Sequence, residues 1–246
     1  MFKKLLLTVS TCLCLSSFPA AYAADSVSQI HGQSNAQKHP SFYDFSDGYQ
    51  GWFVDFADLP VDYLNNDYRL QHKTDVIPLS AKKASHGLFV SGMNRSDDLF
   101  MFITKKLDRS QGISPNTKYQ VTLEFDIATN AAEGLIGIGG SPGESVFVKA
   151  GISNRQPMTT IADSYYHLNL DKGNQATGGK DMQVLGTLEK LNTEDDSYEL
   201  KHFTQTFEAE SNEKGELYVI IGTDSGYEGL TSIYYTNISL KVKKSK

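Results

Sequence analysis

Apolar and polar side chains alternate most regularly over residues 118–128. Every second residue from Tyr119 to Ile127 is apolar, and the residues between them are polar. A two-residue period is typical of a strand that turns one face to a core and the other to water. Residues 99–103 (LFMFI) are instead apolar at every position, which predicts a central strand covered on both faces.

Similar short runs recur along the chain, separated by clusters of Gly, Asn, Asp and Pro. No long apolar stripe of period 3.6 follows residue 23, so helices are expected only as short turns, as within residues 57–66. Many short strands without alternating helices favour an antiparallel sandwich or barrel, and we expect one all-β domain over residues 42–243. The predicted strands cover residues 42–45, 52–56, 68–72, 87–91, 99–107, 118–128, 135–138, 145–150, 165–169, 182–188, 200–208, 217–222 and 232–242.

The N-terminus has the three parts of a secretory signal peptide. Lys3 and Lys4 precede an apolar run, and Ala21-Tyr22-Ala23 supplies the small-x-small cleavage site. We expect residues 1–23 to be removed after Ala23, which leaves no membrane span because the apolar run is too short to serve as one. Residues 24–41 are polar and aperiodic, and predict a disordered leader. The short signal indicates a bacterial protein that is periplasmic or secreted.

Both cysteines, Cys12 and Cys14, lie in the expected signal peptide. An exported chain without them excludes thiol catalysis, zinc–thiolate sites and iron–sulfur clusters. The signal also carries two of the 23 basic residues, so the exported chain has 21 against 29 acidic ones, a net charge of −8. Such an acidic chain argues against nucleic acid as a partner.

Three segments carry a resemblance to a known fold family: FYDFSDGYQGW at 42–52, GISPNTKYQVTLEFDI at 112–127, and the C-terminal stretch 215–242. They resemble the galactose-binding-like jelly rolls, which include many carbohydrate-binding modules. The resemblance implies an antiparallel jelly-roll β-sandwich and a glycan or another polar ligand as partner. Thr236 stands where that family often carries an aspartate before Asn-Ile, a difference that weakens any direct transfer of a calcium site from the family.

Four polar loops interrupt the apolar strands, at residues 94–98, 139–144, 171–175 and 223–228. If they converge at one end of a sandwich, they form a hydrogen-bonding pocket; taken singly, their residues are ordinary turn formers. The predicted ligand-binding residues are Arg95, Asp97, Asp98, Glu144, Lys149, Asp171, Asn174, Gln175, Asp224, Tyr227 and Glu228.

Two kinds of side chain sharpen this prediction. Lys149 lies inside a predicted strand, where its ammonium needs a carboxylate, either as a structural ion pair or as a substrate anchor. Its candidate partners are Asp97, Asp98 and Glu144. Tyr227, between Gly226 and Glu228, is the first choice for stacking on a sugar, whereas Trp52 is expected in the core.

Binding without catalysis is the leading hypothesis, and three alternatives stay open. Calcium could bind carboxylates from a set comprising Asp97, Asp98, Asp171, Asp224 and Glu228. A polysaccharide hydrolase could use a carboxylate pair from the set Glu144, Asp171, Asp224 and Glu228, or Ser141 or Ser225 with His167, although no local signature surrounds either serine. A structural or adhesive extracellular protein would need neither a calcium site nor catalytic residues.

Overall fold

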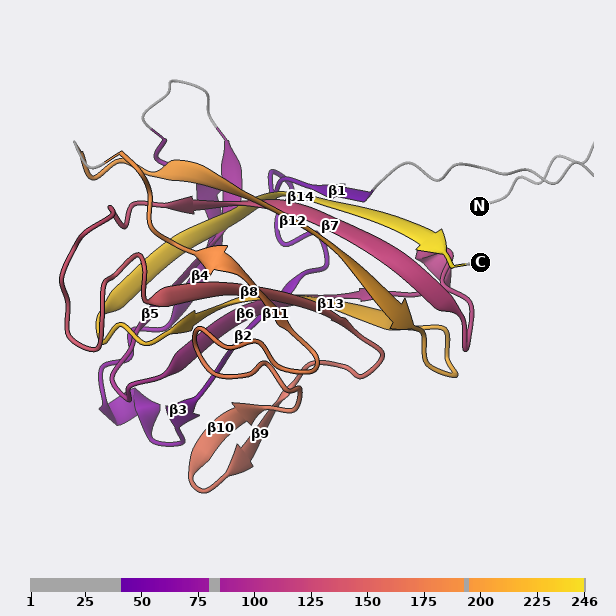
Figure 1. The fold of residues 1–246 in the computed structure, drawn as a ribbon, viewed down its shortest axis with the longest axis horizontal. Helices are drawn as coiled ribbons and strands as arrows, with labels where there is room; N and C mark the ends of the chain where they lie inside the picture. Colours follow the sequence, from indigo (N-terminus) through magenta and orange to yellow (C-terminus); the bar gives the residue numbers. More distant parts are fainter. Residues whose placement is uncertain (1–40, 80–84, 193–194, 246) are drawn as a thin grey trace, which may run out of the picture. The chain divides into compact units, whose positions relative to one another are not determined.

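The computed structural model describes residues 41–79, 85–192 and 195–245 (Figure 1). All of them belong to one unit, Lys38–Lys246. The expected signal peptide and all but the last residue of the expected leader lie outside the described residues. Within the described ranges the only helical elements are two short 3₁₀ turns, and no helix is long and apolar enough to cross a bilayer.

The first large sheet, sheet A, has the strand order β12-β7-β14-β5-β4, and β1 pairs with the last part of β14. All pairs are antiparallel. Its strands are β1 (Ser41–Tyr43), β4 (Gln71–Val76), β5 (His86–Met93), β7 (Lys118–Thr129), β12 (Glu199–Glu210) and β14 (Leu230–Lys244).

The second large sheet, sheet B, is also antiparallel and has the order β11-β8-β13-β6-β2. From β5 onward the chain crosses repeatedly between the two sheets, which stack face to face (Figure 1). This is the predicted all-β jelly-roll sandwich. The strands of sheet B are β2 (Phe53–Ala57), β6 (Leu99–Leu107), β8 (Val146–Ser153), β11 (Gln183–Thr187) and β13 (Leu217–Ser225).

The core fills the space between the two sheets, as the alternating pattern predicts. On β7 the side chains from Tyr119 to Ile127 alternate between a buried inner face and a solvated outer face. Trp52 is 2% exposed and packs in the same cluster, which confirms its expected core position. Removal of this apolar surface from water is the main term that stabilises such a sandwich.

Sheet B is covered on both faces along part of its length. Leu99 and Met101 of β6 point into the main core, whereas Phe100 and Phe102 pack on the outer side with Leu170 and Met182. These last two residues belong to the chain between β8 and β11, and we call residues 168–182 the cover segment. It divides the outer face of sheet B into a covered half and an open half, and explains why residues 99–103 are apolar throughout.

Of the predicted strands, one is a loop in the structure and another begins later than predicted. Residues 135–138 form an exposed loop, in which Ile136 is 98% exposed, because flanking glycines adopt left-handed backbone: Gly134, Gly139 and Gly140 have positive φ. The strand predicted at 68–72 begins only at Gln71, because Arg69 has a φ of 49°.

The structure has a small third sheet that the sequence did not predict. It has the order β3-β10-β9, and only β10 was expected. Its strands are β3 (Leu59–Pro60), β9 (Thr159–Ala162) and β10 (Tyr165–Leu168). By contrast, the short 3₁₀ turn Tyr63–Asn65 lies where a helical turn was predicted.

Candidate functional site

The four polar loops meet at one end of the sandwich. Gln175 joins its own loop to two others, because its side-chain Nε2 donates to the Asp97 carbonyl (3.1 Å) and its backbone N–H donates to Asp224 Oδ2 (2.9 Å). Two further hydrogen bonds join Asn94 Nδ2 to the Ser225 carbonyl (2.9 Å) and the Glu228 N–H to the carbonyl of Ile138 (2.8 Å), the residue just before the loop 139–144. The expected convergence is therefore present, although most of these polar groups bind one another.

A fully buried ion pair lies beneath the cover segment. Lys149 on β8 and Asp224 on β13 are both 0% exposed, and Lys149 Nζ donates to Asp224 Oδ2 at 2.7 Å. The ammonium also donates to the carbonyls of Lys172 (2.9 Å) and Thr177 (3.0 Å). The expected partners of Lys149 were wrong, because Lys149 pairs in register with Gly222 and so faces the residue two positions further along β13.

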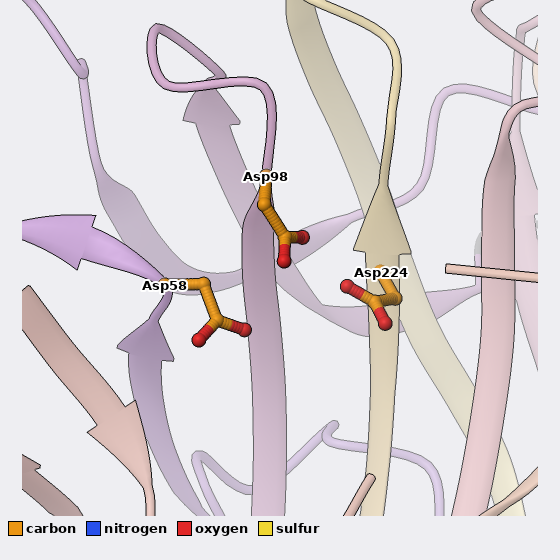
Figure 2. A group of neighbouring side chains, drawn as sticks. All are labelled: Asp58, Asp98 and Asp224. Atoms are coloured by element: carbon orange, nitrogen blue, oxygen red, sulfur yellow. The ribbon is translucent and has the colours of Figure 1, made fainter. Parts of the chain in front are cut away.

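A second lysine joins the pair from the cover segment. Lys172 Nζ lies 2.9 Å from Asp224 Oδ2, 2.9 Å from Asp58 Oδ2 and 3.8 Å from Asp98 Oδ2. It also lies 5.2 Å from the centre of the Phe100 ring. Figure 2 shows the three aspartates converging from the turn after β2, the start of β6 and the end of β13. We call these five charged residues the buried ion network.

Sequence reasoning missed two members of this network. Asp58 follows β2 with a φ of 61°, and Lys172 precedes a turn glycine with a φ of 72°, Gly173. Both residues have the sequence context of solvent-exposed turns, and their burial depends on contacts distant in sequence. No local signal in the sequence distinguishes them from ordinary turn residues.

The carboxyl groups of the network differ in protonation. Burial, followed by the neighbouring carboxylate of Asp224, raises the pKa of Asp98 to about 8. Burial alone would also raise the pKa of Asp224, but Lys172 and hydrogen bonds from Asp98 and Lys149 outweigh it and lower that pKa. At neutral pH Asp98 is therefore mostly a carboxylic acid, which reduces the negative charge that faces Asp224.

The three aspartates of the network are also the best fit to a metal among the described residues. Carboxylate oxygens of Asp58, Asp98 and Asp224 all lie within 4.8 Å of one another, and calcium prefers such hard ligands. However, Lys172 Nζ lies within 4.0 Å of all three and supplies the positive charge itself. A calcium ion at this place would have to displace that ammonium. Calcium binding stays a prediction.

The remaining acids of the predicted set mostly serve their own loops. Asp171 accepts from the backbone N–H groups of Gly173 (3.0 Å) and Lys180 (3.0 Å), which closes the cover segment on itself. Glu144 accepts from the Gly134 N–H (2.8 Å) and from the Ser141 hydroxyl. These bonds match the turn-former interpretation that the sequence left open.

The predicted aromatic and basic contacts also lie elsewhere than expected. Tyr227 is half-buried rather than exposed, and its ring packs over Gly137 and Gly229, where any larger residue would collide with it. Arg95 Nη2 lies 3.1 Å from Asp67 Oδ2, at a different part of the surface from the ion network. Neither residue contacts the network.

The proposed serine triad is not assembled. His167 Nδ1 lies 3.2 Å from Asp58 Oδ1. The Ser141 hydroxyl binds Glu144, and the Ser225 hydroxyl donates to the Tyr227 carbonyl (2.9 Å). The hydroxyls of both serines are thus engaged away from the histidine.

A shallow, open depression lies over the ion network. It has a volume of about 330 Å³, and Asp98, Asp171 and Asn174 of the predicted set line it together with Asp58 and Lys172. The predicted pocket is therefore present in part, as a depression whose charged groups are largely paired with each other.

A larger groove, of about 680 Å³, runs over the open half of sheet B, and no residue predicted from the sequence lines it. We call it the open groove. Phe53 and Asp55 of β2, with Thr104 and Lys106 of β6, form part of its floor. Phe53 is 76% exposed there. The only sequence signal for Phe53 is that it follows the buried Trp52, so strand alternation turns it outward.

The polar side chains of the open groove are held by a few defined contacts. Tyr218 Oη donates to Glu216 Oε2 (3.1 Å), and burial followed by that carboxylate raises the pKa of Tyr218 to about 12. Lys106 Nζ lies 3.6 Å from Glu216 Oε1. Asp55 accepts from the Thr159 hydroxyl (3.1 Å). Two lysines and two acids line the groove, so its charges balance.

Comparison with known proteins gives similarity at the level of the scaffold. No protein family model matches the sequence, and no curated protein matches it. Several of the solved structures that resemble it are carbohydrate-binding modules.

Three of these structures illustrate the range. The CBM22-1–GH10 modules of a Clostridium thermocellum endo-1,4-beta-D-xylanase are 9% identical, with a TM-score of 0.39; the match covers 84% of this chain and 29% of that one. A mannan-recognising module, TmCBM27, is 13% identical, with a TM-score of 0.36; the match covers 83% of this chain and 96% of that one. A Stig cyclase from Fischerella sp. is 12% identical, with a TM-score of 0.37; the match covers 87% of this chain and 93% of that one. Such similarity assigns no ligand.

Proposed function

We propose that the protein is an exported module that binds a glycan in the open groove on sheet B. The observation that supports this most strongly is Phe53, a flat apolar ring that is 76% exposed on the groove floor. Water-exposed aromatic rings that border polar groups suit the faces of sugar rings, which are themselves apolar between hydroxyl groups. Lys106, Glu216 and Gln156 lie around the same groove and supply donors and acceptors for those hydroxyls.

The test is a glycan array followed by titration calorimetry with the best binder. Phe53→Ala is expected to weaken binding at least tenfold. Phe42→Ala is the matched control, because Phe42 is 58% exposed on β1 and outside the groove. Absence of binding to any glycan, or equal affinities of the two variants, would remove the proposal.

Export is the second part of the proposal and rests on the sequence of residues 1–23. Expression of the full chain in a bacterium should yield a protein that begins at Ala24 and fractionates with the periplasm or the medium. A cytoplasmic product that retains Met1 would contradict it.

Hydrolysis of a glycan at the depression over the ion network is a second candidate function. Asp98 has a raised pKa, and carboxylate oxygens of Asp58 lie within 4.8 Å of it, the short spacing that suits a retaining mechanism. Lys172 lies against both groups, which favours a structural role instead. Release of reducing sugar by the wild type, lost in Asp98→Asn, would support hydrolysis; no release would leave binding as the function.

A further inference from the structure

Three hollows follow one another around β2, the edge strand of sheet B. A depression of about 140 Å³ shares Asp55 with the open groove. The same depression shares Phe56, Tyr63 and Leu70 with a cleft of about 480 Å³ on the other side. We call the latter the edge cleft, because β2 and β4, which line it, are the last strands of the two large sheets.

We infer that these hollows form one continuous path for a linear glycan of several sugar units, with a second binding subsite in the edge cleft. This inference rests on the proposed function. The open groove and the edge cleft each fall within the range of volumes that enclose a whole small ligand, about 300–1,000 Å³. Because they are joined through shared lining residues, a short sugar fills one of them and only a longer chain reaches both.

The edge cleft offers aromatic surface of the kind that the open groove offers through Phe53. Tyr63 and Phe56 are half-buried in it, and His72 on β4 is exposed. The His72 ring is oriented by Tyr49, whose hydroxyl lies 2.8 Å from His72 Nδ1, and it lies 6.5 Å from the Phe56 ring. The rings therefore present a fixed surface rather than freely rotating side chains, which lowers the entropy lost on binding.

A charged wall completes the edge cleft. Arg69 forms a two-pronged pair with Asp67, through Nε to Oδ1 (2.9 Å) and Nη2 to Oδ2 (2.8 Å). Both residues adopt left-handed backbone, with φ of 49° and 53°, on either side of the buried Tyr68. Strained non-glycine residues persist only where their surroundings fix them, so this wall is preorganised. Arg95, predicted as a ligand-binding residue, contacts the same Asp67.

The experiment measures how affinity depends on chain length. Calorimetry would compare xylohexaose, mannohexaose and cellohexaose with the corresponding disaccharides. The wild type should bind its preferred hexasaccharide at least tenfold more tightly than the disaccharide. Tyr63→Ala and His72→Ala should lower the affinity for the hexasaccharide at least fivefold and leave the affinity for the disaccharide unchanged. Phe53→Ala should lower both affinities.

Tyr165→Ala is the matched control, since Tyr165 is 38% exposed and lines none of the three hollows. Urea denaturation of each variant separates loss of binding from loss of folding, and the exposed His72 provides a second test if Tyr63→Ala unfolds. Equal affinity for long and short sugars, or edge-cleft variants that match Tyr165→Ala, would overturn the extended path while Phe53→Ala still reports on the groove. Absence of binding to every sugar would overturn both.

Discussion

The two halves of the outer face of sheet B use their outward-pointing side chains for opposite purposes. In the covered half, Lys149 and Asp224 point outward from β8 and β13 but meet Lys172 of the cover segment instead of solvent. In the open half, Phe53 and Lys106 point outward from β2 and β6 and meet no such cover. The segment between β8 and β11 thus decides which polar positions of one sheet face can reach a ligand.

Energetically the two halves differ in what each residue contributes to folding. Charges that are removed from water stabilise a fold only when they stay paired, and loss of one partner leaves the other uncompensated. Exposed ion pairs contribute little, because water and salt screen them. The covered half should therefore be sensitive to substitution, and the open half tolerant. The predictions below test that contrast.

Lys149→Met should have the largest effect, because it removes a charge that is fully buried against Asp224. We expect the free energy of unfolding to fall by about 3–5 kcal/mol, as measured by urea denaturation. Lys106→Met is the control from the open half, with an expected change within about 0.5 kcal/mol. Equal losses in the two variants would mean that the network does not hold the cover segment down.

Met182→Ala should follow. Met182, the last residue of the cover segment, is 1% exposed and packs against the sheet. Its truncation leaves a cavity that should lower the free energy of unfolding by about 2–3 kcal/mol. Met158, which is 47% exposed in the open groove, supplies the matched truncation, with an expected change within about 0.5 kcal/mol. Thermal or urea unfolding measures both. A tolerant Met182 would show that the cover segment is not packed as described.

Asp98→Asn should have an effect whose size depends on pH. The carboxyl titrates near its ordinary pKa of about 4 in the unfolded chain, but burial and the Asp224 carboxylate raise the folded pKa to about 8. The folded state binds the extra proton between these values, so the contribution of Asp98 to stability falls as pH rises through this window and is constant above it. The asparagine stays neutral throughout.

The stability of Asp98→Asn relative to wild type should therefore increase from about pH 5 to about pH 8 and then level off, in urea titrations at fixed salt. Asp224 has a lowered pKa, so its contribution to stability is lost as pH falls, the opposite of the contribution of Asp98. Acid should therefore still destabilise both proteins. Parallel curves for wild type and variant over the whole range would contradict the protonation state assigned to Asp98.

Phe53→Ala should have the smallest effect on folding. Its ring is 76% exposed, so the free energy of unfolding should change by less than about 0.5 kcal/mol, even though the proposed glycan binding should weaken at least tenfold. Phe100, which is 0% exposed in the covered half, gives the contrast, since its truncation should lower stability by about 3–5 kcal/mol. A strongly destabilised Phe53→Ala would place that ring in the core and not in a binding site.

The fold could be predicted from the sequence because its signals are local. Alternation over residues 118–128 predicts β7, and the fully apolar run 99–103 predicts a strand with two covered faces. The loop 134–140 could not be recognised in this way, because its isoleucines suggest a strand while its glycines set the backbone. The convergence of the four loops follows from the sandwich itself.

The candidate sites were less predictable because they depend on partners far apart in sequence. Lys149 in a strand is equally compatible with an exposed anchor and a buried pair, and only the cover segment decides between them. Asp58 and Lys172 have no pattern that distinguishes them from turn residues. The open groove depends on what lies above Phe53, which is a property of the neighbouring segments and not of the strand.

The pairing of β1 with β14 has a mechanical consequence. β1 contributes only three residue pairs, Ser41 with Leu240 through Tyr43 with Ile238, and both chain directions leave this short ladder at the same end. Tension applied between Ser41 and Lys244 would load those hydrogen bonds one after another, as in a zip, instead of shearing them together. The β1 ladder should therefore open before the longer pairing of β14 with β7, and a pulling experiment on single molecules would show it as an early, separate step.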